Sequence, residues 1–228
     1  NWVLQALRRK ALPAAADVRS TSPVSRVFGF DRGKPIDRHY IEKFLRGHAP
    51  LIEGAVLEVG GLDYTRMFAA TALGGARILD FRGDPDGMTV VADLANPDEC
   101  PAEIADCFIC THTFNFIFDV NAAARSAWKL LKPGGALLAT VAAITQISRY
   151  DSERWGDYWR FTPDSVRRIF QPVFGNDLEI AGFGNLAAAI ALLRGEAVED
   201  LADASVLDGA DPDYPVVIGL RARKAGQC

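Results

Sequence analysis

An alternation between continuous apolar runs and amphipathic runs constrains the fold of this chain more than any other sequence feature. The apolar runs have the length of strands: "GAVLEVGG" (54–61), "ARILDF" (76–81), "GMTVVADL" (87–94), "ADCFICTHTF" (105–114) and "GALLATVAAI" (135–144). Runs with helical periodicity fall among them: "RHYIEKFLRGHAPLI" (38–52), "TRMFAATAL" (65–73) and "NAAARSAWKLL" (121–131). Strands that are apolar throughout are buried on both faces, so helices must cover both sides of the sheet. The pattern predicts an α/β fold with a doubly wound parallel sheet.

The remainder of the chain continues this order. A helix over 163–171, a strand "LEIAGFG" (178–184), an Ala-rich helical insert (185–204) and a last strand "YPVVIGLRARK" (214–224) are predicted. Thr162 is the expected N-cap of the helix, because Pro163 and Asp164 then occupy its first turn.

Composition and charge exclude several classes of protein. With 49% apolar residues in 228, one sizeable core and a single domain over 1–228 are expected. The formal charge of −4 argues against a surface that tracks nucleic-acid phosphates, and no apolar run is long enough to span a bilayer. The opening "NWVLQALRRKALPAAADV" lacks the order of a signal peptide, and it could be a truncated start or a surface helix. A cytoplasmic protein is expected.

Acidic and small residues stand where several predicted strands end. Glu58, Gly60 and Gly61 follow the first strand, Asp80 the second, and Asp93 the third. In a doubly wound sheet the ligand binds beyond the carboxyl ends of the strands, and an acid about twenty residues after the first turn can accept both ribose hydroxyls. Glycines at Rossmann spacing are missing from the first turn, so a nucleoside fits this pattern better than a pyrophosphate does.

These motifs resemble those of the class I S-adenosylmethionine-dependent methyltransferases. The resemblance covers about residues 35 to 185 and rests on "VLEVGG", "ILDF", "VVADL" and "LLKPGGALLATV". Within that family, "FGFDRGKPIDRHYIEKFL" and "WGDYWRFTP" resemble segments of bacterial methyltransferases encoded with glycosyltransferases. The resemblance implies a Rossmann-like sheet of seven mostly parallel strands with an antiparallel last strand. It also implies an N-terminal helical lid within residues 1–50 and a helical insert at 185–204.

The resemblance also implies a set of residues that bind the cofactor, S-adenosyl-L-methionine. Glu58, Gly60 and Gly61 would contact its methionine end, and Asp80 its ribose. The full expected set is Arg38 and Tyr40 from the lid, Glu58, Gly60, Gly61, Asp80, Asp93, Leu94, Thr111 and His112. His112 could be a cofactor contact, a base or a local variation.

The segment "WGDYWRFTP" (155–163) supplies the expected acceptor side of the site. Trp155, Tyr158 and Trp159 offer aromatic faces for sugar rings and for the sulfonium cation, and Arg160 could orient the acceptor. A hydroxyl is a poor nucleophile until a base takes its proton. Asp157 and His112 are the predicted catalytic bases, and Asp37 and His39 are less favoured ones.

Several of these residues have structural alternatives. Asp157 could form an ion pair with Arg154 or Arg160, and Asp93 could serve only its own turn. His112 could be a packed imidazole, and the two tryptophans could cover a sheet edge. Cys107 and Cys110 are expected on opposite faces of a buried strand. The spacing of Asp31, Asp37 and Asp151 matches no metal-binding loop, so no metal site is expected.

The sequence therefore predicts a methyltransferase that O-methylates a sugar hydroxyl or a glycosylated metabolite, in glycan or natural-product biosynthesis. A partner subunit that binds the cofactor without catalysis stays open as an alternative. A nicotinamide-dependent oxidoreductase is a further alternative, but Gly-x-Gly-x-x-Gly and Tyr-x-x-x-Lys are both missing. The expected partners are a small-molecule or glycan acceptor, and the 185–204 insert could cap the site or form a homodimer face.

Overall fold

A seven-stranded sheet forms the centre of the computed structural model, which describes residues 20–69, 73–82 and 89–226. The strand order is β3-β2-β1-β4-β5-β7-β6, and only β7 runs against its neighbours. The strands are β1 (Gly54–Val59), β2 (Leu73–Asp80), β3 (Thr89–Val91), β4 (Ala105–Thr111), β5 (Leu131–Ala142), β6 (Leu178–Phe183) and β7 (Val217–Arg223). The predicted fold class and the antiparallel last strand are confirmed. The opening "NWVLQALRRKALPAAADV" lies outside the described residues.

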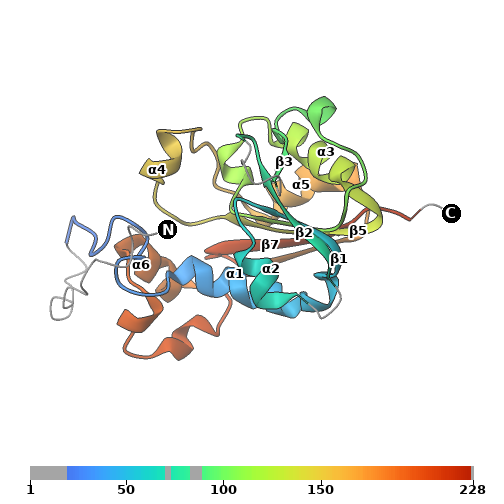
Figure 1. The fold of residues 1–228 in the computed structure, drawn as a ribbon. Coiled ribbons are helices and arrows are strands. Elements are labelled where there is room, and N and C mark those ends of the chain that lie inside the picture. Colours follow the sequence, from blue (N-terminus) through green and yellow to red (C-terminus); the bar gives the residue numbers. More distant parts are fainter. Residues whose placement is uncertain (1–19, 70–72, 83–88, 227–228) are drawn as a thin grey trace.

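Helices cover both faces of this sheet (Figure 1). On one face lie α3 (Val120–Leu130) and α5 (Pro163–Phe174), and on the other lie α1 (Ile36–Gly47), α2 (Asp63–Phe68) and α6 (Leu186–Arg194). Each layer encloses its own apolar core. Cys110 belongs to the core under α3 and α5, and Cys107 to the core under α1 and α6. The predicted opposite orientation of these two thiols is confirmed.

The remaining helical elements are short. They are α4 (Arg149–Ser152) and the 3-10 turns η1 (Ala49–Leu51), η2 (Pro97–Glu99), η3 (Phe114–Phe116), η4 (Val198–Asp200) and η5 (Ala204–Leu207). The predicted insert thus consists of α6 followed by two 3-10 turns. Asn185 caps α6 through the Ala188 amide, and Gly195 ends the helix in the left-handed conformation that glycine adopts without strain.

Local capping chemistry explains where α5 begins. The Thr162 hydroxyl accepts from the Ser165 amide at 3.2 Å, and the Ser165 hydroxyl accepts from the Thr162 amide at 3.0 Å. Pro163 occupies the first helical position and Asp164 the first turn, as predicted. The predicted helix over 65–73 is wrong at its end, because α2 stops at Phe68 and Leu73 already pairs with Gly54 in the sheet.

Helix α1, which is expected to act as a lid, runs antiparallel to the neighbouring parallel strands. Its first turn lies near the carboxyl end of β4, where Asp37 approaches His112, and its last residues lie near the start of β6, where His48 approaches Glu179. The helix packs closely on the sheet at Gly219, where an added Cβ would lie 2.5 Å from the Phe44 ring. A residue with a side chain at position 219 would require the Phe44 ring or α1 to shift.

The strand order reverses direction between β1 and β4, which pair with each other while β2 lies on the far side of β1. In an open α/β sheet, ligands bind at such a reversal, beyond the carboxyl ends of the strands. Among the described residues, no helix is long and apolar enough to cross a membrane.

Candidate functional site

The turn between β1 and α2 lies at this strand reversal. Gly60 has a φ of +75°, a conformation that costs a residue with a side chain. An added Cβ at Gly60 or Gly61 would meet no atom within 4 Å, so space remains in front of the backbone. The Gly60 amide donates to the Leu79 carbonyl at 3.1 Å, which ties the turn to β2. The two glycines thus give a ligand close access to the main chain, as their predicted role requires.

Glu58 supports this turn from behind. Its carboxylate accepts from the Tyr64 amide at 3.1 Å, from the Thr65 amide at 2.8 Å and from the Thr65 hydroxyl at 2.7 Å. Burial raises the Glu58 pKa, although these hydrogen bonds oppose the shift. Both oxygens are engaged with the first turn of α2, whose amides have no partner within the helix. In this structure Glu58 thus supports the turn, and its contact with the methionine end stays a prediction.

Arg38 and Tyr40, both predicted to close the lid on the cofactor, face different surroundings. Arg38 donates to the Tyr64 hydroxyl at 2.6 Å, and its guanidinium lies 5.6 Å from the ring centroid of Phe30. Tyr40 is 1% exposed and packs its ring 6.3 Å from that of Phe183 in the core under α6. Two residues apart on a helix point in different directions, so the two side chains cannot share a face. Only Arg38 is positioned beside the β1–α2 turn.

The acids after β2 and β3 differ in their surroundings. Asp80 ends β2 and accepts from the Arg82 amide at 2.8 Å, with the Arg82 guanidinium at 3.4 and 3.5 Å. Asp93 accepts from the Ala95 amide at 2.8 Å, so it does serve its own turn. Leu94 is buried in the core with α3, and its carbonyl accepts from the Ser126 hydroxyl. Asp80 keeps the position at the strand end that a ribose contact requires.

Two predicted residues come at the end of β4. Thr111 pairs with Thr140 of β5, and the His112 amide extends this pairing by donating to the Thr140 carbonyl at 2.8 Å. His112 has a φ of +46°, and its Nδ1 lies 3.6 Å from Asp37 Oδ2. Burial lowers the His112 pKa to about 4, with Arg38 and Arg160 acting in the same direction and Asp37 against it. The end of β4 thus places a largely buried imidazole next to the Asp37 carboxylate.

The aromatic segment after β5 divides into two groups. Trp155 packs edge to face against Phe81, at 6.1 Å between centroids, and the Arg82 guanidinium lies 5.5 Å from the Trp155 ring centroid. Tyr158 and Trp159 instead lie 5.4 and 6.0 Å from the Phe118 ring, beyond β4. The segment therefore reaches from the end of β2 to the start of α3. In Figure 1, α4, which precedes it, stands beyond the carboxyl ends of the strands.

Asp157 and Arg160 form the ion pair that was one of the two interpretations of Asp157. The two side chains form a bidentate contact at 2.6 and 2.9 Å, and Asp157 also accepts from the Ser148 amide at 2.9 Å. Burial alone would raise the Asp157 pKa, but the hydrogen bonds and the Arg160 charge outweigh it and lower that pKa. A carboxylate held in this way is a weak base. Arg160 also donates to the carbonyls of Trp159 and Gln146, so most of its donors are occupied within the chain.

Asn115 is a residue that the sequence did not single out. It is 2% exposed, and its side chain donates to the Trp159 carbonyl at 2.8 Å and accepts from the Ala142 amide at 3.2 Å. Its own carbonyl accepts from the amides of Tyr158 and Trp159. Asn115 thereby joins the end of β5 to the aromatic segment. A polar residue between two apolar ones in "FNF" is its only sequence signal.

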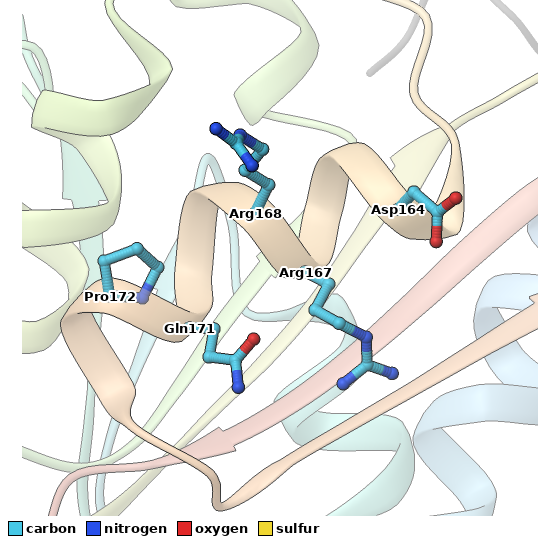
Figure 2. Close-up of a pocket in the computed structure, with 5 residues that line it drawn as sticks. All are labelled: Asp164, Arg167, Arg168, Gln171 and Pro172. Carbon is cyan, nitrogen blue, oxygen red and sulfur yellow. The ribbon is translucent and has the colours of Figure 1, made fainter.

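Other features lie apart from this site. The His39 ring contacts Tyr40, and burial lowers its pKa together with the charges of Lys43 and Lys34. One hollow, of about 620 Å³, lies along the outer surface of α5, and Figure 2 shows that one helix lines it with Asp164, Arg167, Arg168, Gln171 and Pro172. Across the described ranges, no group of three or more His, Cys, Asp or Glu side chains could hold a metal ion.

Residues 48–139, less than half of the chain, match a family model described as a methyltransferase domain. No curated protein matches the chain. The matched range holds the β1–α2 turn and the ends of β2, β3 and β4, which are the elements of the candidate site.

Solved structures share the fold at low sequence identity. N-methyltransferase NodS from Bradyrhizobium japonicum WM9, in complex with S-adenosyl-L-homocysteine, is 16% identical with a TM-score of 0.51, over 85% of this chain and 89% of that one. A methyltransferase from Archaeoglobus fulgidus, described as S-adenosylmethionine-dependent, is 13% identical with a TM-score of 0.51, over 82% and 94%. A chain from the Haloferax volcanii complex of the Trm112 methyltransferase activator is 16% identical with a TM-score of 0.54, over 84% and 92%. The chain therefore has the fold of the class I S-adenosylmethionine-dependent methyltransferases, with a methyltransferase-domain match over residues 48–139.

Proposed function

We propose that this chain is an S-adenosyl-L-methionine-dependent methyltransferase that acts on a hydroxyl of a sugar or of a glycosylated metabolite. The observation that carries the proposal is the open turn at Gly60 and Gly61, within the residues that match a methyltransferase domain. The turn leaves backbone accessible at the strand reversal, where a nucleoside-bearing ligand binds in this class of fold. Asp80 at the end of β2 would accept from the ribose hydroxyls, and Arg38 would close the lid over the turn.

The acceptor side of the proposal rests on the aromatic segment. Tyr158 and Trp159 are 48% and 37% exposed. Both rings pack against Phe118, and Asn115 holds the Trp159 carbonyl, so these exposed rings are fixed in place. Exposed, fixed aromatic faces suit sugar rings, whose C–H faces pack on them, and they also attract a sulfonium. Of the two predicted bases, His112 is the stronger one, because the Asp157 carboxylate is held by Arg160.

When bound, S-adenosyl-L-methionine supplies an electrophilic methyl group on a sulfonium. The residues of this chain would hold the acceptor oxygen in line with that carbon and the sulfur, and such alignment accounts for much of the rate in a displacement of this kind. Displacement also needs the acceptor proton to leave as the new bond forms. The neutral His112 imidazole is available for that proton.

Methyl transfer to a panel of acceptors tests this proposal. The purified protein is incubated with methyl-labelled S-adenosyl-L-methionine and with glycosides, matched deoxy-glycosides that lack single hydroxyls, and amino sugars. We expect labelled methyl ethers from glycosides and none when the methylated hydroxyl is removed. Labelled amines as the only products would overturn the O-methylation, which matters because a structural neighbour, NodS, is an N-methyltransferase. Denatured protein controls for methyl transfer without the enzyme. The Trp159→Ala variant removes one ring of the proposed acceptor surface.

A further inference from the structure

The backbone of His112 is strained. Its φ of +46° lies in the left-handed region, which side-chain-bearing residues rarely adopt, and it directly follows the last residue of β4. The amide of His112 nevertheless stays in the sheet through the Thr140 carbonyl. The strand pairing therefore holds the strain in place and turns the imidazole toward the first turn of α1. Strain of this kind persists where the surrounding structure enforces it, and it is concentrated at functional sites.

The two ring nitrogens of His112 have different surroundings. Nδ1 lies 3.6 Å from Asp37 Oδ2, and both side chains are largely buried, at 15% and 12% exposure. Nε2 is buried and has no hydrogen-bond partner among the residues that the structure describes. An unpaired buried nitrogen costs free energy that burying an apolar side chain would not. The imidazole thus has a carboxylate on one side and an unused nitrogen on the other.

The charges around this imidazole come from two parts of the chain. Asp37 and Arg38 belong to α1, and Arg160 comes from the segment after α4. Both guanidiniums disfavour an imidazolium, and Asp37 is the group that favours it. Asp37 is therefore the charge that would stabilise His112 once it has taken a proton.

Asp37 also has an ordinary helical role, which has to be separated from this one. It lies in the first turn of α1, and its Oδ1 accepts from the Arg38 amide at 2.8 Å. An asparagine could keep that hydrogen bond, because its side-chain oxygen still accepts. Only the second oxygen, Oδ2, faces His112. The Asp37→Asn substitution would thus keep the hydrogen bond in the helix and remove the negative charge beside the imidazole.

We propose that Asp37 is a positioning residue that keeps the His112 proton on Nδ1 and leaves Nε2 as the base of methyl transfer; this rests on the proposed function. In that step a bond forms between the acceptor oxygen and the methyl carbon as the carbon–sulfur bond breaks. The sulfur keeps the electron pair and becomes a neutral thioether. The acceptor proton moves to Nε2, and the resulting imidazolium lies beside the Asp37 carboxylate. Hydrogen bonds of such pairs are often long before substrate binds and shorten in the complex.

The tautomer of His112 can be measured without any cofactor. The chain has three histidines, so long-range proton–nitrogen NMR spectra of histidine-labelled protein can be assigned with His39→Gln and His48→Gln variants. We expect the Nδ1–H tautomer at His112 in the wild type. In Asp37→Asn we expect the Nε2–H tautomer to gain population, because the amide group can donate to Nδ1. Glu42→Gln, which changes another acid of α1 that pairs with Lys34, should leave the His112 signals as they are.

Kinetics give the second readout. Asp37→Asn should lower kcat by about a hundredfold, the lower end of what a positioned base contributes, with little change in KM for the cofactor. Asp37→Glu should recover part of the loss. Since Asp37 raises the His112 pKa, its removal should move the acid limb of the kcat profile to lower pH than the wild-type limb, expected near the His112 pKa of about 4.

Folding has to be followed over the same pH range. The His112 pKa falls from 6.5 to about 4 on folding, so the unfolded chain takes up a proton first as the pH drops, and stability falls through that window. Rates are therefore compared only where circular dichroism shows folded protein. A wild-type Nε2–H tautomer, or an Asp37→Asn variant with wild-type tautomer and kcat, would overturn the proposal. The expected tautomers in a protein that fails to bind S-adenosyl-L-homocysteine would support the positioning by Asp37 and contradict the proposed function instead.

Discussion

At the scale of single residues, acids near the carboxyl edge of the sheet have different partners. Glu58 accepts from the first turn of α2, and Asp157 is bound by Arg160. Asp93 accepts from the amide of Ala95 in its own turn. Asp80 likewise accepts from an amide two residues on, that of Arg82 at 2.8 Å, and its side-chain contact with the exposed Arg82 guanidinium is no closer than 3.4 Å. A bound ribose could therefore replace that contact at little cost.

Asp80 is accordingly the acid whose loss should weaken cofactor binding. In Asp80→Ala we expect the affinity for S-adenosyl-L-homocysteine to fall by about tenfold or more, because the ribose hydroxyls lose a charged acceptor. Calorimetric titration measures the effect, and circular dichroism checks the fold. Asp98→Ala removes an exposed acid in η2, away from the strand ends, and should bind as the wild type does. Equal affinity in Asp80→Ala and Asp98→Ala would contradict the ribose assignment.

At the scale of elements, Asn115 determines where the aromatic segment lies. Its side chain joins residues that are 27 and 44 positions away in the sequence, at Ala142 and Trp159. Such contacts are formed only when β4, β5 and the segment have come together. The sequence predicted an aromatic acceptor surface. For this reason, however, it could not predict that Trp155 packs against Phe81 while Tyr158 and Trp159 pack against Phe118. It did predict the start of α5, because Thr162, Pro163 and Asp164 are neighbours in the chain.

The Asn115→Ala variant should therefore loosen the segment. Removal leaves the Ala142 amide without its side-chain acceptor, while the Trp159 carbonyl keeps its bond from Arg160. We expect the free energy of unfolding to fall by about 1–3 kcal/mol. Urea unfolding measures the loss, and hydrogen exchange of residues 155–161 should speed up more than that of α3. The exposed Asn176, at the end of α5, gives the matched variant Asn176→Ala, for which a change within about 0.5 kcal/mol is expected. Similar losses in both variants would show that Asn115 does not anchor the segment.

At the scale of the whole molecule, the alternation of apolar and amphipathic runs predicted the doubly wound parallel sheet, and the family resemblance supplied its antiparallel last strand. Residues such as Cys107 and Cys110 alternate between two cores because a strand repeats every two residues, and this rule needs no tertiary information. The same reasoning would have separated Arg38 from Tyr40 on their helix. The pairing of His112 with Asp37 could not be predicted in this way, since it depends on how α1 crosses the end of β4.

The fold and the strand-end residues lead to one central claim, that an S-adenosyl nucleoside binds at the carboxyl ends of β1 and β4. The most direct test is calorimetric titration of the wild-type protein with S-adenosyl-L-homocysteine, with NAD⁺ titrated under the same conditions. We expect S-adenosyl-L-homocysteine to bind with a Kd on the order of micromolar, about −8 kcal/mol, and NAD⁺ to show no binding. Binding of NAD⁺ alone, or of neither compound, would contradict the claim.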